Sequence, residues 1–168
     1  MSHYTIAFIV DAENREDAKA VVEDIFNGGN DYSFWDATGF DYGEVLDGDG
    51  EDPDVPRVSP IDSVEGRALL QELMRGMRGT WVHYAKQLYR KMRRARSRGV
   101  SFERMWERYT ENQMRYAAHQ LGSYGGPAIS IYEEHGGGIA NEVGLSRHLT
   151  NPVGDGETRF VVPADVHY

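Results

Sequence analysis

Residues 80–98 constrain the fold more than any other stretch, because their pattern is compatible with only one regular element. Apolar side chains recur at spacings of three and four residues, which places them on one stripe of an α-helix. They are Trp81, Ala85, Leu88, Met92 and Ala95. Gly99 follows and can take the left-handed conformation that closes a helix. The stretch predicts an amphipathic helix whose apolar stripe is covered by neighbouring elements.

The opposite face of this predicted helix is strongly cationic. It carries Lys86, Arg90, Lys91, Arg93, Arg94, Arg96 and Arg98, and no acid lies among them. Because the whole chain has a formal net charge of −9, this positive charge is local and attracts an oppositely charged partner. We expect these seven side chains to bind a partner, with nucleic acid, another protein and a second copy of the chain as alternatives. The protein's own acids at 47–54, Glu103 and Glu107 are a further alternative.

The totals of the sequence limit the class of protein. A chain of 168 residues suggests one domain. The absence of cysteine excludes disulfide-linked partners and thiolate metal sites. No apolar run is long enough to span a bilayer and no leader is recognisable, so we expect a soluble, cytoplasmic protein without a membrane partner. The acidic, lysine-poor composition suits a halophile or a GC-rich genome, and an accessory protein of a virus or mobile element.

The first third of the chain predicts a strand, a helix and a second β element. Residues 4–10 are β-branched and aromatic, as in a buried strand. Asn14 followed by Asp17 resembles a capping box that opens a helix, which ends at the glycines 28–29. Residues 32–46 predict a strand or hairpin that turns near residues 38–39. Residues 47–56 form a polar, acidic loop.

The middle of the chain predicts three helices. The first begins at Ser59 and Pro60 and breaks near Gly79, because Gly76 and Gly79 weaken it. Residues 80–98 form the second helix. The third covers residues 101–121.

The last third predicts a strand, a helix and a strand. The strand at 128–133 is followed by a glycine-rich loop and by a short helix at 143–149. A final strand at 158–162 follows, and we expect Pro163 to limit its pairing.

Together these elements predict an α+β fold. Without the helical block, the order is that of the ferredoxin-like, split βαβ antiparallel sheet. We therefore expect a single domain, residues 1–168, with a sheet portion (1–58 and 123–168) and a three-helix insertion (59–121).

A second candidate site follows from this fold. In a split βαβ sheet the start of the first strand lies near the ends of the third and fourth strands. The arrangement would gather His3, Glu133, Glu134, His135, Asp165 and His167. His3, His135, Asp165 and His167 are the candidate acid–base residues, and Glu133, His135, Asp165 and His167 are candidate ligands for zinc or manganese. A set of exposed polar residues at strand ends is the simpler interpretation.

Two short motifs resemble those of known enzymes. His3-Tyr4-Thr5 and His148-Leu149-Thr150 resemble the paired HxT motifs of the two-histidine phosphoesterases. Residues 135–138, His-Gly-Gly-Gly, resemble the oxyanion loop of some esterases, but the matching GxSxG serine motif is absent. We expect those glycines to supply turn angles instead.

These observations favour a binding or regulatory protein that presents a basic helix to a protein or nucleic-acid partner. No cofactor is predicted, although a divalent metal fits the strand-end residues. The alternative function is a metal- or histidine-dependent phosphodiesterase or nuclease.

Overall fold

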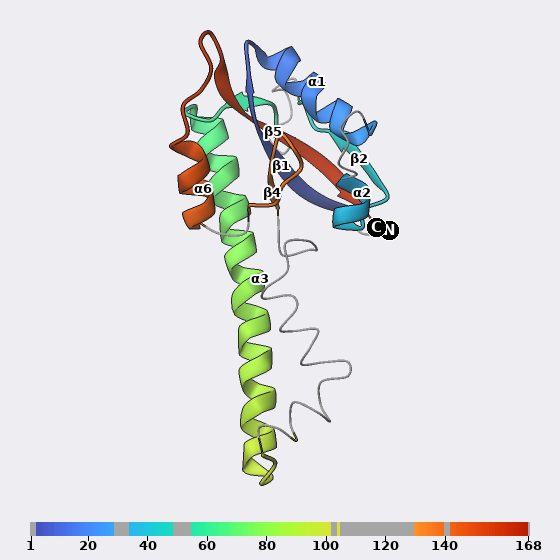
Figure 1. Cartoon of the computed structure of the whole chain (residues 1–168), viewed down its shortest axis with the longest axis vertical. Coiled ribbons are helices and arrows are strands. Elements are labelled where there is room, and N and C mark those ends of the chain that lie inside the picture. Colours follow the sequence, from blue (N-terminus) through green and yellow to red (C-terminus); the bar gives the residue numbers. More distant parts are fainter. Residues whose placement is uncertain are drawn as a thin grey trace.

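Strand β1 (His3–Ala12) runs through a five-stranded mixed sheet in the computed structural model of the protein (Figure 1). The structure describes residues 3–28, 34–48, 55–101, 104, 130–139 and 142–167. Alternate side chains of β1 are buried on opposite faces of the sheet: Ile6 and Phe8 on one, Ala7 and Ile9 on the other. The predicted strand at residues 4–10 is confirmed, and its residues 6–10 are buried, whereas Tyr4 and Thr5 are exposed.

Strand β5 (Thr158–His167) is the principal partner of β1. The two strands are antiparallel over ten residue pairs. Strands β2 (Tyr42–Val45) and β3 (Ser59–Pro60) pair with the other side of β5, while β4 (Ile131–Glu133) pairs with β1 at the opposite edge. The sheet order is therefore β2-β5-β1-β4, with β3 beside β2 along β5.

The predicted mixture of helices and sheet is present, but the split βαβ arrangement is not confirmed. That arrangement requires β1 to be antiparallel to both neighbours, whereas β1 and β4 are parallel. In addition, β2 lies beside β5, at the edge away from β4. Because β4 and β5 run in opposite directions, the residues after β4 and the last residues of β5 lie toward opposite ends of the sheet.

Four helices among the described residues cover the two faces of the sheet. Helices α1 (Arg15–Phe26) and α2 (Phe34–Thr38) pack on the face that carries Phe8. The first part of α3 (Val64–Ser97) and α6 (Glu142–Leu149) pack on the face that carries Ile9. Each face thus has its own apolar core.

Local signals predicted some helix starts and missed others. The side chain of Asn14 accepts a hydrogen bond from the amide of Asp17 at 3.0 Å, so the predicted cap of α1 is confirmed. The hairpin predicted for residues 32–46 is wrong in its first half, where Phe34 is buried within the short helix α2. Helix α3 begins after Ser63, not Ser59, because Ser59 and Pro60 form strand β3.

Helix α3 is continuous through Gly76 and Gly79, so the predicted break is wrong. Each glycine costs a helix about 1 kcal/mol relative to alanine. Leu70, Leu73 and Met77 are buried on the sheet, and each contributes about 1.5–3 kcal/mol. The burial outweighs the two glycines and fixes the direction of the helix.

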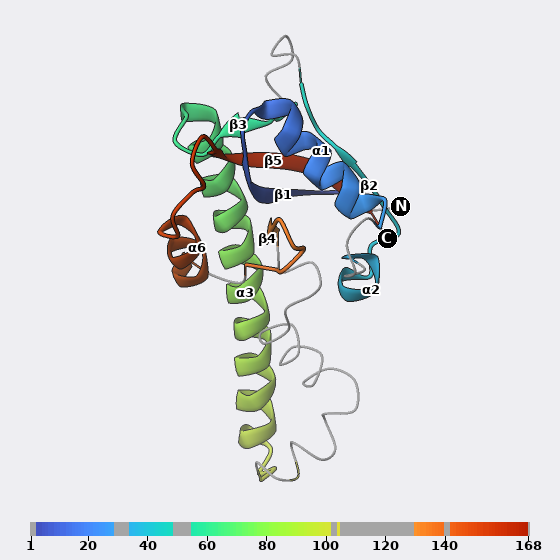
Figure 2. The same ribbon diagram turned by 45° about the horizontal axis from the view of Figure 1, so that its top comes forward.

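Beyond Met77, α3 leaves the sheet and projects from it (Figures 1 and 2). The projecting part, from Arg78 to Ser97, is about 30 Å long at 1.5 Å per residue. Its only buried residue is Ala95, in a small separate cluster with Leu88, Met92 and Val100. The three-helix insertion is not confirmed, because the first half of α3 belongs to the sheet layers. The predicted third helix lies almost wholly outside the described residues.

Strand β5 continues through Pro163, contrary to the limit predicted there. The carbonyl of Pro163 accepts a hydrogen bond from the amide of Leu46 at 2.9 Å. The amide and carbonyl of one strand residue point to the same side, so the missing N–H faces β2 and not β1. Pairing with β1 therefore continues without interruption to His167.

Candidate functional site

Six of the seven predicted cationic side chains lie on the projecting part of α3, and the seventh, Arg98, is its C-cap residue. Of the seven, six are exposed and one, Lys91, is partly buried. The exposed ones are Lys86, Arg90, Arg93, Arg94, Arg96 and Arg98. None of the seven forms an ion pair within the part of the chain that the structure describes.

The acidic loop does not neutralise this segment through Asp47. Its carboxylate accepts hydrogen bonds from the guanidinium of Arg15, at the start of α1, and from the amide of Val58 at 3.2 Å. Asp47 therefore joins a helix start to the strand region at the sheet end of the molecule. Residues 49–54, Glu103 and Glu107 lie outside the described residues.

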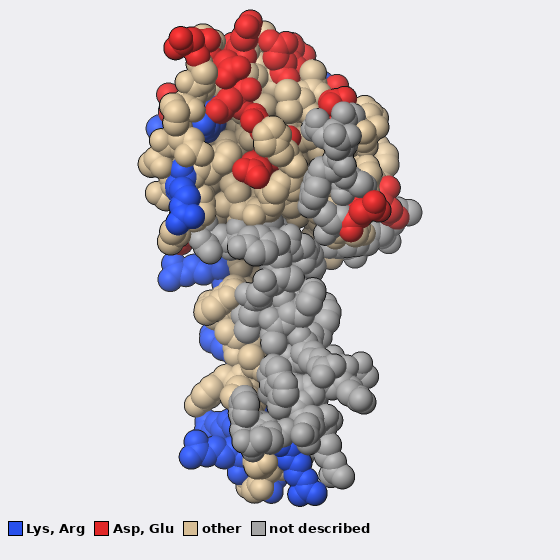
Figure 3. Space-filling view, viewed as in Figure 1, with Lys and Arg blue, Asp and Glu red and all other residues tan. Residues whose placement is uncertain are grey.

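Charge is segregated along the molecule on the face seen in Figure 3. Among the side chains coloured there, Asp and Glu gather over the sheet, while Lys and Arg gather at the far end of α3. The chain has 27 acids and 18 Lys and Arg, yet α3 itself contains only two acids, Glu65 and Glu72. The projecting helix is a local positive surface on an acidic protein.

The structure brings together only some of the predicted strand-end residues. A hydrogen bond of 2.6 Å joins His3 Nδ1 to Asp165 Oδ2, and the rings of His3 and His167 have centroids 5.2 Å apart. His167 Nδ1 is buried and lies 3.2 Å from Asp41 Oδ1 without a hydrogen bond. Tyr42 stacks on the ring of His167. These side chains occupy the end of the sheet at which β1 begins.

Tyr42 is an exposed member of this group. Its hydroxyl donates a hydrogen bond to Glu44 Oε2 at 3.0 Å. This bond, together with the negative charge of Glu44, raises the pKa of Tyr42 above its ordinary value.

The remaining predicted residues lie elsewhere. Glu133 is aligned with Ile9, toward the other end of β1, and its carboxylate lies 3.6 Å from His148 Nδ1. His135 contacts Glu134 at 3.6 Å and is exposed. Within the described part of the chain, no three His, Asp or Glu side chains are arranged to share a metal ion. The six predicted residues thus form two separate groups.

The two HxT triplets are also separated. His3 begins β1, whereas the carbonyl of His148 accepts a hydrogen bond from Arg159, which pairs with Asp11 near the end of β1. Eight residues of extended strand separate His3 from Asp11, about 27 Å. The structure therefore does not place the two histidines in one centre.

The chain turns directly after β4, over residues 133–136, and Gly138 then forms a β-bridge with Tyr132. Gly136 has a φ of +78°, and its amide donates to the carbonyl of Glu133 at 2.8 Å. The amide of Glu133 in turn donates to the carbonyl of Gly137 at 2.9 Å. The expected turn angle is therefore supplied by Gly136, whereas Gly137 and Gly138 have no positive φ.

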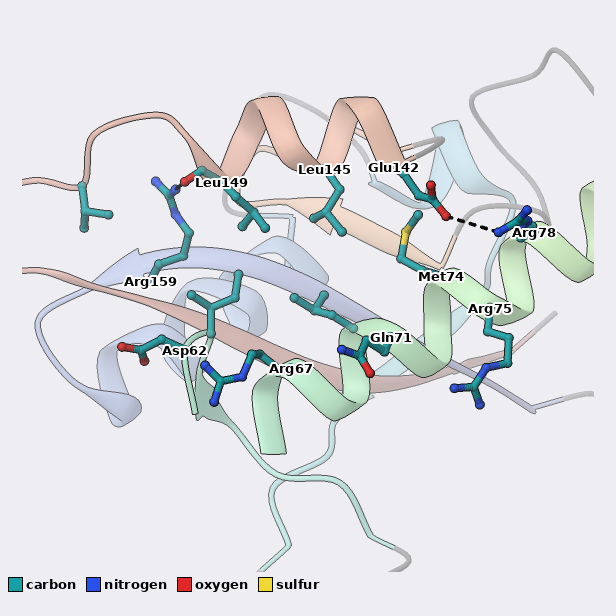
Figure 4. Close-up of a pocket in the computed structure, with 13 residues that line it drawn as sticks. Asp62, Arg67, Gln71, Met74, Arg75, Arg78, Glu142, Leu145, Leu149 and Arg159 are labelled. Atoms are coloured by element: carbon teal, nitrogen blue, oxygen red, sulfur yellow. Dashed lines mark hydrogen bonds and ion pairs between the residues drawn. The ribbon is translucent and has the colours of Figure 1, made fainter. Parts of the chain in front are cut away.

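A groove of about 780 Å³ lies between α3 and α6 (Figure 4). Met74 of α3 and Leu145 and Leu149 of α6 give it an apolar lining. At one end Arg78 lies 3.9 Å from Glu142. The groove has the size of a ligand pocket, but its lining residues form no acid–base or nucleophilic group.

The other end of the groove is closed by Arg159, which is 6% exposed. Nε and one terminal nitrogen donate to the two oxygens of Asp11 at 2.6 Å each. The second terminal nitrogen donates to the carbonyls of His148, Leu149 and Asn151 at 3.0–3.3 Å. The hydrogen bonds to Asp11 raise the pKa of Arg159. All three of its nitrogens donate to Asp11 or to carbonyls at and just after the end of α6, so its role is structural.

Sequence reasoning missed several cations on α3. Arg67, Arg75 and Arg78 are exposed, and Arg67 and Arg75 point away from α6 in Figure 4. Their spacing of eight and three residues was a usable signal, because it continues the cationic pattern of residues 86–98. The predicted break at Gly79 concealed that continuity.

Within the described ranges, no helix is both long enough and apolar enough to cross a membrane. No curated protein and no solved structure matches the chain. One family matches over residues 2–168, nearly the whole sequence. The chain therefore belongs to the family described as a domain of unknown function, DUF7995.

Proposed function

We propose that the protein is a non-enzymatic binding protein that holds nucleic acid by its phosphate backbone. The binding element is the cationic segment of α3, residues 86–98. The observation that carries the proposal is that six of its seven cations are exposed and that none of the seven makes an ion pair with the described residues. Arg and Lys on a helix surface can contact successive phosphates, and Arg binds them with two donors.

A nucleic acid suits this surface better than a folded protein partner. Protein interfaces are enriched in Arg, but their cores are depleted in charged residues as a class and enriched in aromatic side chains and Met. The exposed side of residues 86–98 has the opposite character, with six exposed cations and a single exposed large apolar side chain, Tyr89. An acidic protein and a second copy of the chain are the competing partners that the experiment must separate.

The acids in the rest of the chain also favour binding of nucleic acid through the projecting helix. A polyanion is repelled by the acids gathered over the sheet and attracted to the far end of α3 (Figure 3). The protein would therefore approach nucleic acid with its projecting helix first. An intracellular location, where nucleic acid is accessible, fits this proposal.

The test is a charge-reversal pair with a matched control. Arg93→Glu with Arg96→Glu is compared with Arg57→Glu with Arg147→Glu, which changes the net charge equally but on the sheet portion. Binding of a labelled oligonucleotide at about 50 mM salt is measured by fluorescence anisotropy. The first pair is expected to weaken binding at least about tenfold, because two phosphate contacts become repulsive, and the control pair less than about threefold.

Three results contradict the proposal. One is the absence of binding by the unchanged protein at low salt. Another is an equal loss of oligonucleotide affinity in the two charge-reversal pairs, which would mean that binding depends only on the net charge of the protein. The third is salt-sensitive self-association that the oligonucleotide does not compete with, which assigns the surface to a second copy.

A further inference from the structure

The cationic surface of α3 is longer than the segment predicted from sequence. Exposed polar and charged side chains follow one another along a single face of the helix at spacings of three or four residues. The residues of this face, in chain order and including the apolar Val82, are Arg67, Gln71, Arg75, Arg78, Val82, Lys86, Tyr89, Arg93 and Arg96. Residues at these spacings are neighbours on a helix surface. We call this face the α3 stripe.

The stripe runs parallel to the helix axis. Its eight steps cover 29 residues, a mean of about 3.6, which is the period of the α-helix. From Arg67 to Arg96 it extends about 43 Å at 1.5 Å per residue. Neither of the two acids of α3, Glu65 and Glu72, lies on it. The contact from Glu142 to Arg78 is between exposed side chains and is screened by solvent.

Two large aromatic side chains are exposed on this face or beside it. Tyr89 is 65% exposed and lies between Lys86 and Arg93. Trp81 is 53% exposed and follows Arg78 by one helical turn. The sequence placed Trp81 on the covered apolar stripe, but the structure leaves it half in solvent. Cations interleaved with exposed aromatic rings are the combination that binds a backbone and stacks its bases.

We propose, on the basis of the proposed function, that the α3 stripe binds single-stranded DNA or RNA, with bases stacked on Trp81 and Tyr89. In a duplex the base faces are covered by neighbouring pairs and cannot reach these rings. The stripe is straight and about 43 Å long, which exceeds one turn of a duplex, about 34 Å. Over one turn the phosphates of a duplex wind around the duplex axis and therefore away from a straight protein helix. A flexible single strand can follow the whole stripe.

The experiment compares a labelled 20-nucleotide oligothymidine, an oligouridine of the same length and a 20-base-pair duplex. The single strands are expected to bind at least about tenfold more tightly than the duplex. Trp81→Ala and Tyr89→Ala are each expected to weaken single-strand binding about fivefold or more, because one stacked base is lost. The conservative variants Trp81→Phe and Tyr89→Phe retain most of the affinity. Both side chains are exposed, so circular dichroism should show unchanged helix content.

Tyr42→Ala is the matched control, because Tyr42 is 47% exposed but lies at the end of the sheet. It should leave binding unchanged. Equal affinity for duplex and single strand, or full affinity in both alanine variants, overturns this inference. If Arg93→Glu with Arg96→Glu still abolishes binding in that case, the proposed function stands without base stacking. If polyglutamate binds as tightly as the oligonucleotides, both this inference and the proposed function are overturned.

Discussion

Arg159 shows how one side chain sets the local architecture. It pairs across the sheet with Asp11 and donates hydrogen bonds to the carbonyls of His148 and Leu149 at the end of α6, where a helix leaves its last carbonyls without intrahelical partners. Asn14 could be predicted as a cap from its neighbours in sequence. Arg159 could not, because Asp11 is 148 residues away and their pairing depends on the sheet register.

Replacing Arg159 should be among the most damaging single changes in the described residues. Arg159→Met is expected to lower the free energy of unfolding by about 3–5 kcal/mol, because it leaves Asp11 as a partly buried, unpaired charge. Urea denaturation measures this loss. Arg147→Met, at an exposed arginine of α6, is the control and should change stability by less than about 0.5 kcal/mol.

A double-mutant cycle makes the source of that loss explicit. Asp11→Asn with Arg159→Met should be less destabilised than the sum of the two single variants, since the unpaired charge is gone. Strictly additive losses, or a loss below about 1 kcal/mol in Arg159→Met, would contradict the role assigned to this pair.

At the scale of elements, α3 decides both the fold and the candidate site. The sequence correctly predicted a helix with a cationic face at residues 80–98. It did not predict that the same helix begins at Val64, because propensity alone cannot weigh two glycines against burial on a sheet. That error also hid Arg67, Arg75 and Arg78, which extend the stripe.

Glycine substitutions test the continuity of α3. Gly76→Ala and Gly79→Ala should each raise the free energy of unfolding by up to about 1 kcal/mol. A Cβ atom at either position meets no other atom within 4 Å. Urea denaturation measures this gain in stability as a higher midpoint concentration of urea with an unchanged m-value.

Gly66 provides the contrasting variant in the same helix. A Cβ atom there would clash with the carbonyl oxygen of Pro60, so Gly66→Ala should destabilise the protein. Loss of stability in both Gly76→Ala and Gly79→Ala would mean that α3 is interrupted where the structure shows it continuous.

For the whole molecule, the class of fold could be predicted but the topology could not. Alternation and caps identified most of the strands and helices that the structure describes. The parallel pairing of β1 with β4 joins residues that are far apart in sequence, such as Ala7 and Ile131, and no local pattern encodes it. That pairing separates His135 from His167, so the predicted strand-end site was tied to a sheet order that the molecule does not have.

At the scale of the whole molecule, acidic and basic side chains are also segregated. On the face seen in Figure 3, Asp and Glu gather over the sheet, and Lys and Arg gather at the far end of α3. Binding should consequently be governed by phosphate contacts along α3 and should respond to salt more than to base sequence.

The most direct test of this account is the salt dependence of oligothymidine binding by the unchanged protein. If four to six cations of the α3 stripe contact phosphates, log Kobs should fall linearly with log salt concentration with a slope of about −3 to −4. Arg93→Glu with Arg96→Glu should reduce the magnitude of the slope by at least about 1. A slope near zero, or no binding at about 50 mM salt, would contradict the claim that α3 is a nucleic-acid-binding element.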